Sequence, residues 1–205
     1  MKTAVVFLAS GFEEVEALSP VDYLRRAQVD LKTVKIPDDS ETLRVKSSHG
    51  VPVIADCSLA EYLSDTDRGL PDAIIIPGGM PGSENLGKCT LLVDFIKKIY
   101  AAHKLVCAIC AAPIVVVAQT GLLADHKYTC NPGWETKLEK YIPDTEERDR
   151  CMAGSILERG TQIVVDGHLI TACGAGAAEE FSLEIIKHLC DGETVSNIKL
   201  HTCMR

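Results

Sequence analysis

The chain has 205 residues, 46% hydrophobic and 24% charged, a composition typical of globular proteins and not of disordered or fibrous ones. Its 21 Lys and Arg residues against 29 Asp and Glu residues give a formal net charge of −8. This acidity argues against duplex nucleic acid or an anionic membrane as the main partner, because both require a basic surface. No apolar run approaches the roughly 20 residues of a membrane-spanning helix. Without a linker, repeat or low-complexity tract, the chain is predicted to form one domain over residues 1–205.

The cysteines and histidines indicate compartment and cofactor use. Nine cysteines are an odd number and too sparse for a disulfide framework, so a reducing cytoplasm is the expected location. An acidic stretch follows the first apolar run, where a signal peptide would have a small-residue cleavage site. Six scattered histidines disfavour a zinc site, and no glycine-rich phosphate loop is present. We therefore expect neither a metal nor a cofactor.

The first half of the chain alternates β-branched runs with one clear helix start. Ser19, followed by Pro20 and an acid in the first turn, is typical of a helix N-terminus and predicts a helix to about Gln28. Apolar runs predict strands at residues 4–9, 31–36 and 51–55.

The second half continues the alternation. Residues 73–76 form an entirely apolar run, as expected of a central strand covered on both faces. Asp166-Gly167 predicts a type I′ turn in a hairpin. The remaining patterns predict a strand at 105–109, helices at 91–101 and 113–120, and a last clear helix with Phe181, Ile185, Ile186 and Leu189 on one face. This order predicts an α/β fold: a mostly parallel sheet with helices on both faces and an added antiparallel hairpin.

Cys110 directly follows the strand predicted at residues 105–109. In a parallel sheet, ligands bind outside the carboxyl ends of the strands. A cysteine at this bend, with a helix N-terminus pointing at its sulfur, is expected to have a lowered pKa. The alternative is a buried core cysteine, the commonest environment of a free thiol.

Two other segments reach the same edge of the sheet. Gly78 and Gly79 follow the apolar run at 73–76, and their amides could stabilise an oxyanion. Glu16 lies beyond the first strand; if it turns inward, burial would raise its pKa and keep it protonated. Taken alone, Glu16 is more simply interpreted as a solvated acid, and Gly78 and Gly79 as an ordinary strand-to-helix turn.

Cys107 and Cys110 form a C-x-x-C pattern, which raises a thioredoxin-like alternative. Redox pairs of that kind open a helix, whereas Cys107 falls inside a predicted strand, so we expect it in the core. Cys130 is a candidate resolving thiol near the site.

Taken together, the strand ends resemble the DJ-1/ThiJ/PfpI superfamily, specifically its DJ-1/ThiJ branch. The matches keep the family's order over about 170 residues, which makes the set specific although each motif alone is weak. The matching stretches are residues 11–16, 20–27, 77–82 with Asn85 and Leu86, 108–113, and 174–176 with Glu180 and Phe181.

The resemblance implies a flavodoxin-like three-layer fold, a homodimer and a set of site residues. Cys110 matches the family's nucleophile, Glu16 the protonated glutamate beside it, and Gly78 and Gly79 the amides on the oxyanion side. The branch often has His where this chain has Asn131, which cannot exchange a proton near neutral pH.

Two further positions complete this comparison. Ala111 follows the nucleophile and is a candidate substrate-binding residue, as is Asn131. Because Ala111 stands where the protease-like branch has a His, the resemblance speaks against protease activity.

Two functions follow from this resemblance. The first is a cofactor-independent glyoxalase or deglycase-type enzyme acting on small 2-oxoaldehydes, with Cys110 as nucleophile and Glu16 as proton shuttle. The second is a redox sensor or stress chaperone, in which the same thiol is oxidised to sulfinate and held by Glu16.

Overall fold

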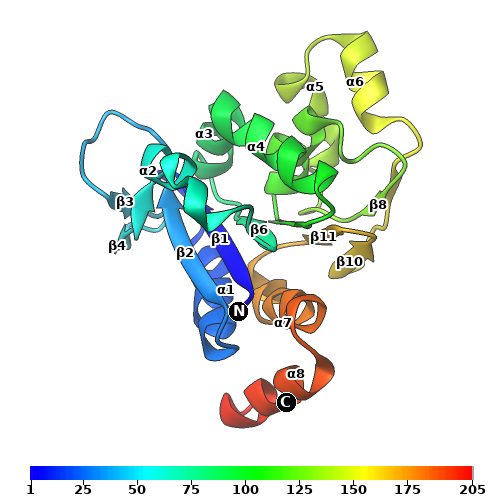
Figure 1. Ribbon diagram of the computed structural model, residues 1–205. Coiled ribbons are helices and arrows are strands. Elements are labelled where there is room, and N and C mark those ends of the chain that lie inside the picture. Colours follow the sequence, from blue (N-terminus) through cyan, green and yellow to red (C-terminus); the bar gives the residue numbers. More distant parts are fainter. Residues whose placement is uncertain (205) are drawn as a thin grey trace.

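A seven-stranded sheet in the order β10-β11-β7-β6-β1-β2-β5 lies at the centre of the computed structural model, which describes residues 1–204 (Figure 1). All neighbouring strands are parallel except β10 and β11. The predicted α/β class with a mostly parallel sheet is confirmed. The strands are β1 (Thr3–Leu8), β2 (Asp30–Lys35), β5 (Cys57–Ser58), β6 (Ala73–Ile76), β7 (Leu105–Ile109), β10 (Ile163–Asp166) and β11 (Leu169–Ala172).

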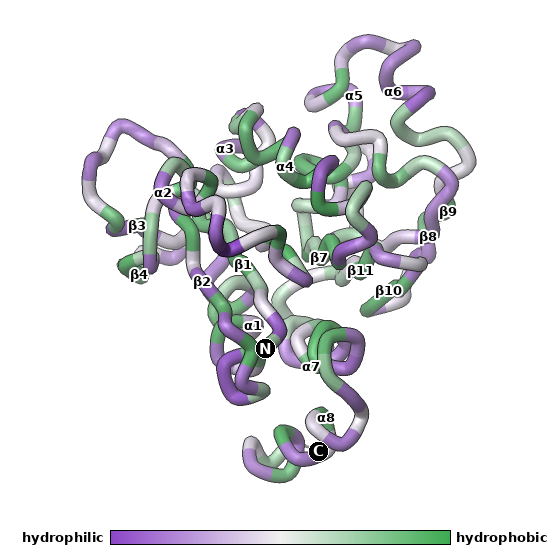
Figure 2. Tube along the Cα trace, in the orientation of Figure 1, coloured by the Kyte–Doolittle hydropathy of each residue, from purple (hydrophilic) through white to green (hydrophobic). Residues whose placement is uncertain are grey.

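Helices cover both faces of this sheet, because each central strand buries side chains on both sides. In β1, Val5 and Phe7 join one apolar core, and Val6 and Leu8 join the other. Helices α3 (Gly82–Lys88) and α4 (Thr90–Ala101) close the first core, while α1 (Glu14–Arg26) and α7 (Ala178–Leu189) close the second. Figure 2 shows apolar residues concentrated in the central strands. The result is a flavodoxin-like three-layer arrangement.

Short elements complete the described chain. Strands β3 (Arg44–Lys46) and β4 (Pro52–Ile54) form a separate antiparallel pair, so the strand predicted at 51–55 is not part of the main sheet. Strands β8 (Lys127–Tyr128) and β9 (Ile156–Leu157) form another small pair. The remaining helices are α2 (Leu59–Ser64), α5 (Leu138–Tyr141), α6 (Thr145–Met152) and α8 (Gly192–His201), which follows the helix expected to be the last. Among the described residues, no helix is long and apolar enough to cross a membrane.

The prediction that Ser19 caps the first helix is wrong. The helix begins at Glu14, and the carboxylate of Glu13 accepts a hydrogen bond from the backbone nitrogen of Glu16 at 2.7 Å. Pro20 therefore lies inside α1. Glu13 and Glu14, for which the sequence favours a solvated position, form the start of the helix that places Glu16.

Two other local predictions need correction. The loop of the β10–β11 hairpin is Gly167-His168, because Asp166 still pairs with Leu169. Only Gly167 in this loop has a positive φ, +60°, so the turn is not the predicted type I′, which needs two. The segment predicted as a helix at 113–120 consists of a π-helical turn, Pro113–Val117, and a 3₁₀ turn, Ala118–Thr120.

We expect Phe181→Ala to lower the free energy of unfolding by about 3–5 kcal/mol, because a ring fully buried between α7 and the sheet leaves a cavity. Urea denaturation at fixed pH measures this loss. The matched control is Leu200→Ala in α8, whose side chain is 73% exposed and should change stability by less than about 0.5 kcal/mol. Equal losses in both variants would contradict the assignment of the core.

Candidate active site

Cys110 lies at the carboxyl end of β7 and has a strained backbone. Its φ is +65°, a left-handed conformation that residues with a Cβ rarely adopt. The surrounding chain holds it there: its nitrogen donates to the Ala172 oxygen at 2.8 Å, and its carbonyl accepts from the Asn131 nitrogen at 2.9 Å. Strain fixed by neighbouring segments in this way is a feature of functional sites.

Glu16 turns into the protein, as the resemblance implies. The residue is 1% exposed, and its Oε2 accepts a hydrogen bond from the Gly78 nitrogen at 2.8 Å. Burial raises the pKa of Glu16 to about 7, and the negative charge of Glu13 adds to this rise. Groups at Cys110, Gly78 and Ala175 act in the opposite direction. Glu16 is therefore a carboxyl group that is half protonated near neutral pH.

Gly78 and Gly79 allow the close approach of the three segments. A Cβ on Gly78 would lie 2.5 Å from Oε2 of Glu16 and 2.7 Å from Cβ of Cys110, so no larger residue fits without displacing the site. Gly79 has a φ of +89° and packs directly on the backbone of Glu13.

The amides of this loop do not act as one pair. The N–H of Gly78 is already bonded to Glu16, so the expectation that both glycine amides bind an oxyanion needs correction. The amides that face the sulfur of Cys110 are those of Gly79 and Ala111. Ala111 is buried and contributes through its backbone.

The predicted lowering of the Cys110 pKa is not observed. Burial raises the pKa of this thiol, and a negative charge on Glu16 raises it further, while the amides of Ala111 and Gly79 oppose the rise only in part. The turn and the helix N-terminus lower the pKa of a thiol, but the loss of solvent around this sulfur outweighs them.

Asn131 lies next to the site, where the resemblance placed it. Besides its backbone bond to Cys110, its Nδ2 would lie 3.3 Å from a Cβ on Gly174. The same Cβ would lie 3.9 Å from Oε1 of Glu16. Asn131 and Glu16 therefore both border Gly174.

The other two cysteines named from the sequence, Cys107 and Cys130, are both buried. Cys107 is fully buried inside β7, and burial raises its pKa well above the ordinary value, which confirms its expected place in the core. Cys130 is also buried, and it lines a small cavity that contains Cys173 and not Cys110.

Some residues that shape the site were missed or undervalued in the sequence. Glu13 caps the turn that carries Glu16, and its side chain is only 14% exposed. His49 lies 3.1 Å from Oε2 of Glu14, and with Glu13 these two residues bring ligand-type atoms within 4.8 Å of one another. No motif signalled this contact, because His49 comes from the separate β3–β4 segment.

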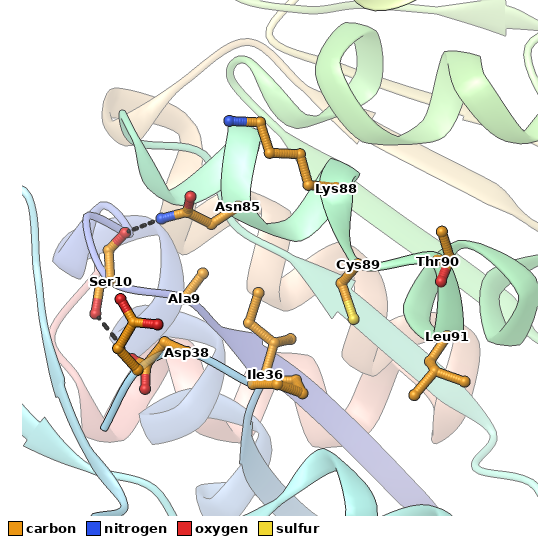
Figure 3. Close-up of a pocket in the computed structure, with 11 residues that line it drawn as sticks. Ala9, Ser10, Ile36, Asp38, Asn85, Lys88, Cys89, Thr90 and Leu91 are labelled. Carbon is orange, nitrogen blue, oxygen red and sulfur yellow. Dashed lines mark hydrogen bonds between the residues drawn. The ribbon is translucent and has the colours of Figure 1, made fainter. Parts of the chain in front are cut away.

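A larger pocket lies at the carboxyl ends of β1 and β2. It has a volume of about 520 Å³ and contains none of the predicted site residues. Figure 3 shows Asn85 Nδ2 donating to the carbonyl of Ser10, and the hydroxyl of Ser10 bonded to Asp38. The first bond ties α3 to the end of β1, and the second ties the end of β1 to the segment that follows β2.

Comparison with known proteins identifies the family. The DJ-1/PfpI family model matches residues 2–188. Protein dj-1beta of Drosophila melanogaster is 33% identical over 197 residues, 96% of this chain and 94% of that protein. A glutathione-independent glyoxalase of Caenorhabditis elegans is 28% identical over 208 residues, 99% of this chain and 97% of that protein. The solved structure of oxidized DJ-1 from Toxoplasma gondii is 30% identical, with a TM-score of 0.80 and coverage of 99% and 98%. The chain belongs to the DJ-1/PfpI family.

The raised pKa of Glu16 predicts a pH-dependent stability. The pKa of Glu16 is about 7 in the folded protein, against an ordinary value of 4.5. Protonation of Glu16 therefore contributes stability that is fully present below pH 4.5 and is lost as the pH rises through 7. The difference corresponds to about 3 kcal/mol. In Glu16→Gln this contribution is absent.

Urea unfolding of both proteins from pH 4.5 to 8 tests this prediction. We expect the stability of the wild-type protein, relative to Glu16→Gln, to fall by about that amount over this interval. Parallel pH profiles would show that folding does not raise the pKa of Glu16.

Proposed function

We propose that this protein is a cofactor-independent glyoxalase or deglycase-type enzyme that acts on small 2-oxoaldehydes through Cys110 and Glu16. The observation that carries the proposal is the contact between a buried carboxyl with a pKa of about 7 and a thiol held in a strained turn. The glyoxalase among the relatives supports it. The residues 1–205 would act as one domain.

The two acids explain how a thiolate can form although burial raises the pKa of the Cys110 thiol. Cys110 and Glu16 interact strongly, so their protons leave in steps that belong to the pair. The first proton leaves near pH 7, and the second is held because it would leave two negative charges side by side. A singly charged pair can place its charge on sulfur while Glu16 keeps the proton.

In the first step, the sulfur attacks the aldehyde carbon of the substrate. A C–S bond forms, the aldehyde oxygen gains negative charge, and the proton held by Glu16 moves to it, giving a hemithioacetal. The amides of Gly79 and Ala111 face the sulfur and are placed to stabilise that charge.

In the second step, Glu16, now a carboxylate, removes the proton from the former aldehyde carbon and returns it to the adjacent ketone carbon, while the hydroxyl proton of the former aldehyde carbon passes to the ketone oxygen. The product is a thioester of a 2-hydroxy acid, formed without net oxidation. Water then cleaves the C–S bond, which releases the hydroxy acid and restores the thiol. Asn131, which cannot exchange a proton near neutral pH, would hydrogen-bond the substrate.

We expect purified protein to convert methylglyoxal to lactate, with Cys110→Ser reducing turnover below detection. Glu16→Gln should lower kcat by about 10²–10⁴-fold, since it removes the proton shuttle while keeping the side-chain shape. Lactate is measured by an enzymatic assay, and Cys151→Ser, which changes a half-buried thiol outside the site, is the control. Activity that survives in both site variants would refute the proposal.

The second candidate is a redox sensor using the same thiol. Oxidation of Cys110 to sulfinate adds two oxygens, and a protonated Glu16 could donate a hydrogen bond to one of them. Asn131 at the position of the branch's His favours this candidate, because the chain lacks an imidazole base there. The oxidized DJ-1 structure from Toxoplasma gondii is a related protein in an oxidized state.

Mild hydrogen peroxide should then add about 32 Da to the peptide containing Cys110. We expect Glu16→Ala to reduce the yield of this product, because it removes the hydrogen-bond donor to the sulfinate. Peptide mass spectrometry after alkylation measures it. Uniform oxidation of the nine cysteines, or an unchanged yield in the variant, would count against the sensor.

A homodimer and a cytoplasmic location also remain proposals. Analytical ultracentrifugation and fractionation of cells test them directly.

A further inference from the structure

Two cysteines outside the candidate active site lie on neighbouring segments. Cys130 follows β8, and Cys173 follows β11. One residue before Cys130, the nitrogen of Thr129 donates to Oγ1 of Thr171 at 2.9 Å. This buried hydrogen bond fixes the two segments against each other just before both cysteines.

The segments stay together beyond the cysteines, where the side chain of Asn131 borders Gly174. Between these two contacts, Cys130 and Cys173 line one cavity of about 240 Å³, which Cys110 does not line. The other residues around the cavity are Thr129, Pro132, Glu135, Leu157, Arg159, Gly160 and Thr161.

The two thiols differ in access and in their electrostatic environment. Cys130 is 4% exposed, whereas Cys173 is half-buried. Burial raises the pKa of Cys130 to about 12, and the negative charges of Glu135 and, to a smaller degree, Cys173 add to this rise. The guanidinium of Arg159 acts in the opposite direction.

We propose that Cys130 and Cys173 form a second redox site, a dithiol that a hydroperoxide converts to an intramolecular disulfide independently of Cys110. This goes beyond the proposed function, which uses neither residue. The pair also differs from a Cys110–Cys130 resolving pair, because Cys110 does not line the cavity that Cys130 and Cys173 share.

The chemistry proceeds in two balanced steps. The more accessible thiol of Cys173 attacks the hydroperoxide; an S–O bond forms, the O–O bond breaks, and water or an alcohol leaves, so that sulfur is oxidised to a sulfenic acid. The thiol of Cys130 then attacks this sulfur. An S–S bond forms, the S–O bond breaks, and the hydroxide leaves as water with the proton of Cys130. Overall, two thiols are oxidised and one peroxide is reduced.

The experiment treats the full-length Cys110→Ser protein with hydrogen peroxide, so that oxidation at the candidate nucleophile does not interfere. We expect a mass decrease of about 2 Da, reversed by dithiothreitol. After alkylation and tryptic digestion, residues 128–137 should be cross-linked to residues 160–187. These peptides contain Cys130 and Cys173 as their only cysteines.

Two variants keep the test informative if one fails to fold. Cys173→Ser and Cys130→Ala should each abolish the cross-link, whereas Cys190→Ser, at an exposed thiol, should leave it unchanged. In protein that retains Cys110, the same cross-link should form. The proposal is overturned if no cross-link forms, or if Cys110 is the partner of either cysteine. Because the readout is a mass and not turnover, its failure is distinct from failure of the glyoxalase proposal.

Discussion

The contact that organises this site is the burial of the Glu16 carboxyl against Cys110 and the Gly78 amide. A carboxylate inside a protein is costly unless it is hydrogen-bonded or protonated. Here the hydrogen bond from the Gly78 amide and the proton shared with Cys110 offset that cost. The contact requires a glycine at position 78, because a Cβ there would collide with both partners. It also requires the helix to begin at Glu14, nearly two turns earlier than a Ser-Pro start would place it. Helix start, glycine turn and strained cysteine are therefore one structural unit.

Much of the fold could be predicted from the sequence, because the pattern of apolar residues follows from which faces of each strand and helix are buried. Strands such as residues 73–76 are apolar on both faces, and only a sheet covered by two helical layers buries them. The sequence indicates a strand at 51–55, but the pairs β3–β4 and β8–β9 could not be predicted, since each strand has only two or three residues and β8 and β9 lie far apart in the chain. The first helix was misplaced for a related reason. Glu13 gives no stronger capping signal than Ser19, and only the fold shows which residue bonds to the free amides.

The same limit applies to the candidate site. The order of motifs located Cys110, Glu16 and the two glycines, because parallel strands bring their carboxyl ends to one edge. The order of motifs could not predict which amide binds which group. The amide of Gly78 bonds to Glu16, and the amides of Gly79 and Ala111 face the sulfur. Nor could the thiol pKa be predicted, since its sign depends on how much water the fold removes from the sulfur.

The sharing of one charge between two acids bears on the choice between enzyme and sensor. In the singly charged pair, a thiolate beside a neutral carboxyl is a nucleophile with its proton donor already in place. The same arrangement after oxidation is a sulfinate beside a hydrogen-bond donor. What separates the two functions is whether the Glu16 carboxyl can lose its proton and regain it during a catalytic cycle. Asn131 cannot assist that exchange, so an enzyme of this form must route every proton through Glu16 or through water. Catalysis would then depend on pH through the pair alone, whereas accumulation of the oxidised thiol needs only that Glu16 remain protonated.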